Sequence, residues 1–321
     1  FALFFASFLK DRYGFEAPFY SSVAITLLMF INLSIGFFKL KPYIEEHISS
    51  PKIIIKAVLA ICAYIAIVFI TLKNPNIASA TIFIAAILCL IILIKSAQGQ
   101  HWKHAGIALA FFILSILYWS IYFQIFISVL VFIDKTVAHN FLSFQLGSSQ
   151  FLAIESLSVV LFGSILGKLW LHFGKIGKPV HDIDKFNLGF IIIGLAFLFF
   201  YIMTIIGNPA AKLPAIIIFI GLVIIAISEL CLSAIGLSMI TKVAPKGYVS
   251  LYMGIWLVTI GIGGKIGGFL SSNIDITDNI MLSKANMAHG FMIFFILAVS
   301  GSIICYLARK SIIKYSKESH K

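Results

Sequence analysis

Three acidic residues lie within or at the edge of long apolar runs: Asp134, Glu155 and Glu229. An ionised carboxylate in hydrocarbon costs roughly 2.5 kcal/mol or more, so such groups usually face a bundle interior or a water-filled cavity and have a partner. Glu229 lies too deep in its run to reach the membrane surface, which favours a functional role. Asp134, at the end of a run beside Lys135, favours a structural ion pair or an interfacial position. For Glu155 both interpretations stay open.

Glu155 and Lys265 form the candidate pair for proton chemistry. Counted from the outer ends of their runs, both lie about two helical turns deep. An ion pair between them would neutralise both charges. A buried carboxylate whose cationic partner comes and goes changes its affinity for a proton with conformation. Glu155, Lys265 and, at the membrane edge, Asp134 are therefore the candidate residues for proton coupling or gating.

The elements that must position these residues are transmembrane helices. Hydrophobic residues make up 61% of the 321 residues and charged residues 11%, and the mean hydropathy is +1.07. A soluble domain is nearer half apolar and a quarter charged. The apolar runs are continuous for about 20 residues, which is typical of spanning helices rather than of the alternating strands of a barrel. The composition predicts an all-α, multi-pass membrane protein in a lipid bilayer.

Nine full spans are predicted after an opening half-span. Their limits are 19–38, 53–72, 79–95, 105–133, 149–170, 187–206, 214–240, 248–270 and 287–308. The connections between them are short, charged and rich in Pro and Gly. The chain opens on Phe1 within an apolar segment, so we expect an N-terminal part of the protein to be missing from it.

The distribution of basic residues predicts the orientation. Of the 24 Lys and Arg residues, 17 lie in one set of alternate loops and the C-terminal tail, six lie in the other set, and Lys265 lies inside a span. An excess of this kind in short loops is typical of the cytoplasmic side. The C-terminus is therefore expected in the cytoplasm. Lysines beside spans account for the net charge of +12, so nucleic acid is not predicted as a partner.

No pattern in the sequence predicts catalysis, a cofactor or a metal site. The cysteines lie singly in apolar runs without metal-ligand spacing: Cys62, Cys89, Cys231 and Cys305. The segment GIGGKIGG, residues 261–268, is not a phosphate loop, because Ile266 stands where Ser or Thr is needed and no strand precedes it. Its small residues predict close helix packing instead. The protein is not expected to be an enzyme.

Several of these segments together resemble one transporter family. SELCLSAIGLSMITKVAP resembles the tenth-helix signature of the proton-dependent oligopeptide transporter family of the major facilitator superfamily, and YMGIWLVTIGIGG resembles its eleventh helix. YWSIYFQ, FLAIESLSVVLFGSILGKLW and DKFNLGFIIIGLAFLF resemble its seventh, eighth and ninth helices in order, and KDRYGFEAPF its connection from helix five to helix six.

The resemblance implies a major facilitator helical bundle. It would comprise the C-terminal half, two inserted helices and an N-terminal remnant. Residues 1–40 would be the end of helix five and helix six, residues 41–100 a linker with the two extra helices, and residues 101–321 the C-terminal six-helix bundle with its basic tail. Helices one to four would be absent.

The resemblance also implies roles for single residues. Glu229 matches the tenth-helix glutamate that receives the amino terminus of a peptide. Trp119 and Trp256 match aromatics that form side-chain pockets, although their depth also fits a bundle core. Gln124 of the seventh-helix motif and Glu155 complete the expected substrate-binding set.

Two departures from the family pattern concern carboxylates. Phe123 stands where many members have a glutamate on the seventh helix. Glu155 and Ser156 replace the Asn and Pro common on the eighth. The change suggests a relocated proton site or altered substrate choice.

The function implied is a proton-coupled symporter that imports di- and tripeptides by alternating access, in the inner (plasma) membrane. Peptide and protons would be its partners, together with the lipid bilayer and helices one to four. Two alternatives stay open. The first is a carrier of amino acids or other amine-bearing solutes, and the second is a membrane scaffold that keeps only the fold.

Overall fold

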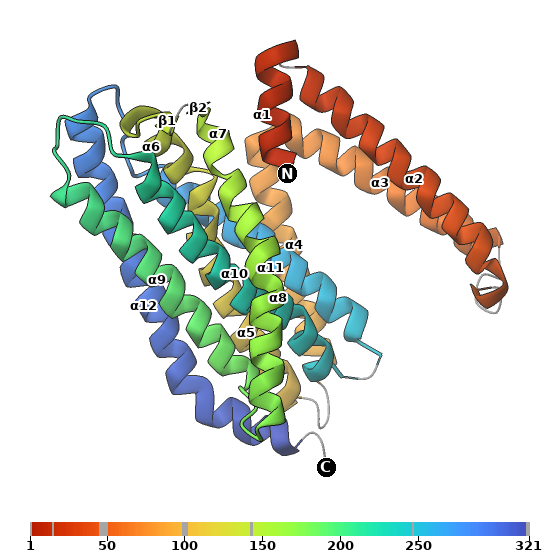
Figure 1. The fold of residues 1–321 in the computed structure, drawn as a ribbon. Coiled ribbons are helices and arrows are strands. Elements are labelled where there is room, and N and C mark those ends of the chain that lie inside the picture. Colours follow the sequence, from red (N-terminus) through yellow and green to blue (C-terminus); the bar gives the residue numbers. More distant parts are fainter. Residues whose placement is uncertain are drawn as a thin grey trace. The chain divides into compact units, whose positions relative to one another are not determined.

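The computed structural model describes residues 2–14, 16–44, 51–97, 102–141, 144–245 and 247–318. It divides into two compact units, residues 4–84 and residues 85–321, with the division inside one helix. Figure 1 shows that both units are built from helices. The candidate site residues all lie in the second unit.

The first unit consists of α1 (Ala2–Tyr13), α2 (Ala17–Ile44), α3 (Pro51–Lys73) and the start of α4 (Pro75–Ser96). Gly14 ends α1 with a φ of 89°, a left-handed conformation that favours glycine at a helix end. Asn74 caps α4, because its side-chain oxygen accepts from the backbone N–H groups of Asn76 and Ile77 at 3.0 and 3.4 Å. Gly14 thus ends one apolar helix and Asn74 begins another.

The second unit continues from α4 into the longer series of helices. Its helices are α5 (Trp102–Tyr122), the 3-10 turn η2 (Phe123–Ile125), α6 (Ser128–Thr136), α7 (Ser148–Phe151), α8 (Ala153–Lys175), α9 (Asp182–Ile206), α10 (Ala215–Val243), α11 (Val249–Ser271) and α12 (Ile280–Glu318). Between α6 and α7, strand β1 (Asn140–Phe141) pairs antiparallel with β2 (Phe144–Gln145).

Each of the nine predicted spans falls on helical structure. In the described residues, eight helical segments are long and apolar enough to cross a membrane, and a shorter apolar stretch, Val58–Thr71, lies within α3. These findings confirm the all-α membrane fold. The limits differ most for α12, which runs from Ile280 to Glu318 rather than over 287–308, and for α2, which ends at Ile44 rather than at residue 38. The predicted division at residues 40 and 100 stays a prediction.

Two predicted spans are interrupted at positions that no Pro or Gly marks. The span 105–133 is divided into α5, η2 and α6, and the span 149–170 into α7 and α8. At the first break, Phe126 and Ile127 donate to carbonyls three residues earlier at 3.1 and 3.2 Å, as in a tighter 3-10 turn. Polar side chains compensate the backbone there, as described below for Gln124.

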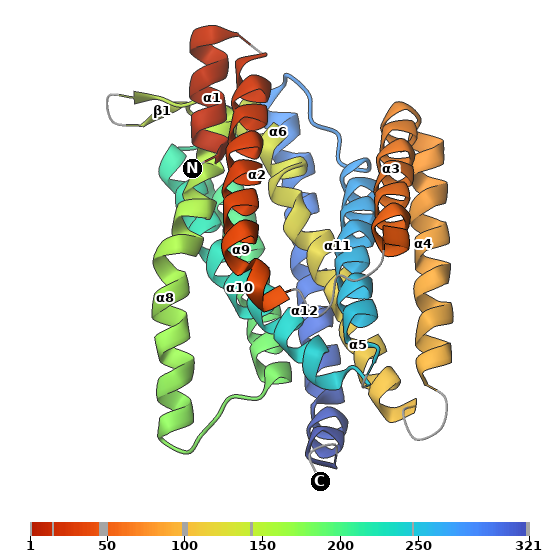
Figure 2. The ribbon, with the colours of Figure 1, turned by 90° about the vertical axis from the view of Figure 1, so that its right-hand side faces the viewer.

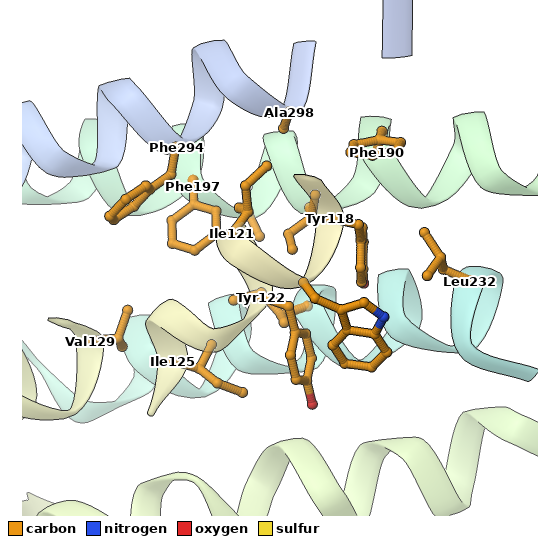
Figure 3. Packing of buried hydrophobic residues seen from close by; sticks show 14 of the residues in the cluster. Tyr118, Ile121, Tyr122, Ile125, Val129, Phe190, Phe197, Leu232, Phe294 and Ala298 are labelled. Atoms are coloured by element: carbon orange, nitrogen blue, oxygen red, sulfur yellow. The ribbon is translucent and has the colours of Figure 1, made fainter. Parts of the chain in front are cut away.

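Aromatic side chains fill the centre of the second unit. Helix α9 packs against both α10 and α12, α5 packs against α11 and α12, and α8 packs against α10; Figure 2 shows these helices from a second side. Two phenylalanines of α9 are fully buried: Phe197 beside Phe294 of α12, and Phe190 beside Tyr118 of α5. Figure 3 also places Tyr118 and Tyr122 of α5 in this cluster. Each large buried side chain contributes about 1.5–3 kcal/mol relative to its exposed state when water is the reference solvent.

Helix α11 lies very close to α5 at the segment GIGGKIGG. A Cβ atom added at Gly263 would lie 2.6 Å from the Cβ of Trp119, and one added at Gly267 would lie 2.9 Å from the carbonyl oxygen of Ser120. Only residues without a side chain fit at these distances. The prediction that this segment serves close helix packing is therefore confirmed.

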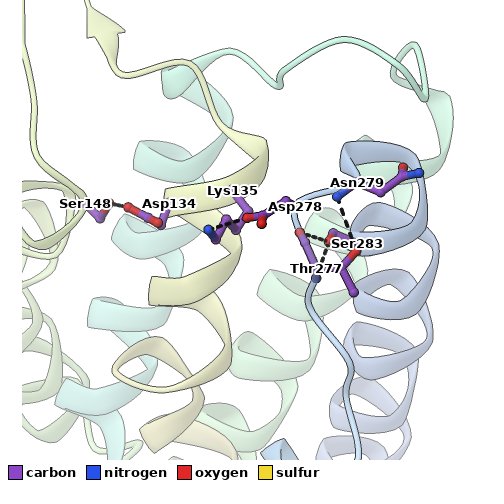
Figure 4. A network of polar contacts seen from close by, with 7 residues as sticks. All are labelled: Asp134, Lys135, Ser148, Thr277, Asp278, Asn279 and Ser283. Carbon is purple, nitrogen blue, oxygen red and sulfur yellow. Dashed lines mark hydrogen bonds and ion pairs between the residues drawn. The ribbon is translucent and has the colours of Figure 1, made fainter.

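A polar network joins α6, α7 and the start of α12 (Figure 4). Lys135 donates to Asp278 at 2.6 Å, and Ser148 donates to Asp134 at 2.9 Å. The hydrogen bond and positive charge of Lys135 lower the pKa of Asp278 below its ordinary value. Asn279 caps α12 by accepting from the N–H of Leu282 at 3.2 Å.

Candidate functional site

Glu155 and Glu229 lie together inside the helix bundle, although 74 positions of sequence separate them. Tyr122 of α5 joins them. Its hydroxyl lies 2.9 Å from Oε1 of Glu155 on α8 and 3.1 Å from Oε2 of Glu229 on α10. Glu155 is 3% exposed. Glu155, Tyr122 and Glu229 are called the carboxyl cluster below.

Hydroxyl groups surround the carboxyl cluster. Ser156 donates to Oε2 of Glu155 at 3.2 Å. One turn before Tyr122, the hydroxyl of Tyr118 lies 2.8 Å from that of Ser228, which donates to the carbonyl of Gly189 on α9. Because residues four apart share a face of a helix, Tyr118 and Tyr122 both point from α5 toward α10. Their rings stack at 6.2 Å between centroids.

The two tryptophans lie in the packed core. Trp256 is 2% exposed, and its ring lies against Gly236 of α10, where an added Cβ would be 2.1 Å away. Trp119 is 7% exposed, and its ring meets that of Tyr122 edge to face at 5.1 Å. Its indole N–H is buried and has no hydrogen-bond partner among the described residues. The bundle-core reading fits both side chains in this conformation, and the pocket role stays a prediction.

Gln124 supports the break between α5 and α6. It is fully buried, and its amide nitrogen donates to the carbonyls of Ser120 and Gly267 at 3.0 and 2.9 Å. Its amide oxygen accepts from Ser128 at 2.7 Å. Both of its donors are thus used within the protein. Its predicted contact with substrate is untested by this arrangement and stays a prediction.

The predicted ion pair between Glu155 and Lys265 was wrong for this structure. Lys265 is exposed on α11, and it has no ion pair within the part of the chain that the structure describes. Similar depth in two helices did not place the two side chains on facing sides. Asp134 is exposed and bonds to Ser148 rather than to Lys135. The roles of Lys265 and Asp134 in proton coupling or gating stay predictions.

Sequence reasoning missed the residue that joins the carboxyl cluster. Tyr122 lies within YWSIYFQ, well inside a span and away from the interfaces where tyrosine is usually enriched. A buried tyrosine needs a partner for its hydroxyl, and that requirement was the available signal. Among the described residues, no group of three or more His, Cys, Asp and Glu side chains forms a possible metal site. The cluster can accept a cationic group or hold a proton.

Comparison with known proteins identifies the class of protein. The family model described as the POT family matches residues 1–287. The chain belongs to this family of peptide transporters and is not an enzyme.

The relatives agree with the family assignment. Over 171 residues the chain is 30% identical to the uncharacterized transporter YclF of Bacillus subtilis strain 168, covering 53% of this chain and 34% of that protein. It is 21% identical over 317 residues to dipeptide and tripeptide permease A of Escherichia coli K12, covering 96% of this chain and 62% of the permease. The permease A of Erwinia pyrifoliae is 22% identical and is covered to 63%. The chain thus spans less than two thirds of the length of these relatives.

Solved structures show the same fold. Tetrameric PepTSo2 matches with a TM-score of 0.76 at 18% identity, over 98% of this chain and 67% of that one. A point mutant of the peptide transporter POT in complex with alafosfalin matches with a TM-score of 0.75 at 18% identity, over 96% of this chain and 63% of that one. The helices of this chain are therefore arranged as in peptide transporters.

Proposed function

We propose that this chain is the larger part of a proton-coupled symporter that imports di- and tripeptides by alternating access. The proposal places it in the inner membrane with its C-terminus in the cytoplasm, and the family's helices one to four complete it. The observation that carries the proposal is the carboxyl cluster, in which Tyr122 joins the buried Glu155 to the half-buried Glu229 in the bundle of a peptide-transporter fold.

Glu229 would bind the amino group of the peptide. The hydroxyl of Tyr122 is the neutral partner of its carboxylate in this structure. Glu229 is half-buried, and a neutral partner leaves part of the desolvation of its carboxylate uncompensated. An ammonium group would supply the opposite charge with short, charge-assisted hydrogen bonds. Substrates without a positive charge would lack this gain, which favours peptides and other amines as the ligand class.

Glu155 would carry the coupled proton. The family's seventh-helix glutamate is replaced by Phe123, so this half needs another titrating group. Glu155 is buried and lies one hydroxyl away from the proposed amine site. Proximity of this kind links the charge at one carboxyl to the protonation of the other.

The test uses the protein at the full length of its relatives, reconstituted in proteoliposomes. Addition of dialanine should acidify the lumen of vesicles that carry a pH-sensitive dye, and an outside-acid gradient should drive accumulation of the peptide. Proton movement with free amino acids but not with dialanine would identify the amine or amino acid carrier instead. No solute-driven proton movement, in protein that is correctly inserted, would favour the scaffold.

A further inference from the structure

If both acids of the carboxyl cluster are ionised, the single proton of the Tyr122 hydroxyl is not enough for a hydrogen bond to each. A phenol has one proton and can fully donate to one oxygen at a time. Yet carboxyl oxygens of Glu155 and Glu229 lie 2.9 and 3.1 Å from the same hydroxyl oxygen of Tyr122, and both distances are those of hydrogen bonds. Both contacts have a proton when one acid is protonated. That acid then donates to the hydroxyl oxygen, and Tyr122 donates to the other carboxylate.

Among the described residues of the second unit, no cation forms a hydrogen bond or an ion pair with Glu155 or Glu229. On α5, Tyr118 is bonded to Ser228. The cations on neighbouring helices are engaged elsewhere or exposed: Lys242 with Asp182, Arg309 with Asp184, Lys284 with the carbonyls of Asn208 and Ala211, and Lys168, Lys175 and Lys265 exposed.

The remaining titratable groups of these helices do not supply a charge to the cluster. The thiols of Cys231 and Cys305 are buried and free. Tyr252 of α11 lies 2.7 Å from the hydroxyl of Ser96, and His289 of α12 is exposed. Among the described residues of the second unit, only a proton therefore neutralises one of the two acids.

We propose that Tyr122 is a proton relay between Glu229 and Glu155. With Glu229 protonated, its proton passes to the hydroxyl oxygen of Tyr122 while the phenolic proton passes to Glu155. Tyr122 is a neutral phenol before and after the transfer. Glu229 becomes a carboxylate, Glu155 becomes an acid, and one proton has moved from the first to the second.

The relay couples the substrate to the proton, and it rests on the function proposed above. An ammonium group that enters beside Glu229 favours the carboxylate there and so drives the proton to Glu155. Departure of the ammonium reverses the transfer. Tyr122 therefore acts on the linkage between the two sites, and the binding of the amine itself is assigned to Glu229.

The chain offers a matched pair of variants to test the relay. Tyr122→Phe removes the hydroxyl that joins the acids. Tyr118→Phe removes an equally buried hydroxyl one turn away, which bonds to Ser228 and touches neither acid. In full-length protein in proteoliposomes, Tyr122→Phe should reduce the initial rate of proton-driven accumulation of dialanine by about a hundredfold or more, the lower end of the range for a lost proton-transfer group. Counterflow of dialanine and the transport by Tyr118→Phe should stay near wild type.

A spectroscopic measurement separates a relay from a structural role. In the infrared difference spectrum of wild-type protein, dialanine should shift the band of a protonated carboxyl group as the proton changes residue. Tyr122→Phe should abolish that shift, and Glu155→Gln should abolish it too. On accumulation, the two substitutions should be non-additive, since each breaks the same transfer.

The possible failures are distinguishable. If Tyr122→Phe accumulates dialanine like wild type and keeps the infrared shift, the relay is wrong while symport stands. Equal damage from Tyr118→Phe and Tyr122→Phe would likewise overturn the relay in favour of packing. If wild-type protein moves no protons with dialanine, the proposed symport itself fails.

Discussion

Acidic residues are satisfied in two different ways in the second unit. At the start of α9, Asp184 accepts two hydrogen bonds from the guanidinium of Arg309, at 2.5 and 3.0 Å. Asp278 is likewise paired with Lys135. In the carboxyl cluster, Glu155 and Glu229 share the hydroxyl of Tyr122, and Ser156 also donates to Glu155. The acids with cations are partly or largely exposed, whereas the buried Glu155 and the half-buried Glu229 have no ion pair among the described residues.

The difference teaches where function is to be expected. An exposed ion pair is worth roughly 0–1 kcal/mol and has no need of a further ligand. A buried acid without a cation has a charge that only a proton or a positively charged ligand can balance. The predictions below set substitutions in the carboxyl cluster against substitutions in the exposed pairs.

The largest effect is expected for Glu229→Gln in the full-length transporter. Apparent affinity for dialanine should fall about tenfold to a hundredfold, because a hydrogen bond to a charged group contributes about 1.5–3 kcal/mol and each 1.4 kcal/mol is tenfold. Saturable uptake is then lost at low peptide concentration, which radiolabelled uptake would measure. Membrane insertion should be intact. Asp184→Asn is the control from an ion pair, and uptake by Glu229→Gln with unchanged apparent affinity would refute the assignment.

Glu155→Gln should uncouple transport rather than abolish binding. The amide cannot take up a proton, so accumulation against a gradient should stop, while counterflow, which needs no net proton movement, should continue. Lys168→Ala is the control on α8 itself, since Lys168 is exposed and lies 13 residues after Glu155 along the same helix. A Glu155→Gln transporter that still concentrates peptide would place the proton site elsewhere in the protein.

Substitutions of Trp119 and Trp256 should show whether these side chains line a substrate pocket or only pack in the bundle core. Trp119→Phe keeps one aromatic ring and removes the unpartnered N–H with part of the ring area, whereas Trp119→Ala and Trp256→Ala remove most of the apolar area. If the tryptophans line a pocket, the alanine variants should weaken bulky dipeptides more than dialanine, by about tenfold for roughly 1.4 kcal/mol of lost burial. Competition assays with a peptide series would measure this. Equal loss for all peptides would support the bundle core.

The smallest effect is expected at the ion pair between Lys135 and Asp278. Because Lys135 lowers the pKa of Asp278, the contact stabilises the fold above the ordinary aspartate pKa, and the stabilisation is lost as pH falls through the lowered value. The difference in Tm between wild type and Asp278→Asn should therefore be small at neutral pH and shrink further as the pH falls below the ordinary aspartate pKa. Asp278 is almost fully exposed, with 93% of its side chain accessible. A difference that grows on acidification would contradict the assignment.

The sequence was sufficient to predict the helices and to single out Glu229 as a carboxylate deep in a span. Span length follows from apolar runs, and a deep carboxylate is costly wherever its helix packs. The partner of Glu155 required more, because depth along two helices says nothing about their rotation about their axes. That rotation is set by packing, for example by Gly263 against Trp119. The break after Tyr122 was also invisible, since neither Pro nor Gly marks it.

The break between α5 and α6 also allows α6 to tilt about η2 as a short rigid helix. The nine residues of α6 are about 13 Å long, so a tilt of about 10° at η2 displaces the far end by roughly 2 Å. That end is tied to the connection between α9 and α10, because Leu213 donates to Thr136 and Ala138 donates to Leu213, each at 2.8 Å. The 3-10 turn η2 lies immediately after Tyr122. A slight change of tilt beside the carboxyl cluster would therefore give a larger sideways displacement of the connection that precedes α10.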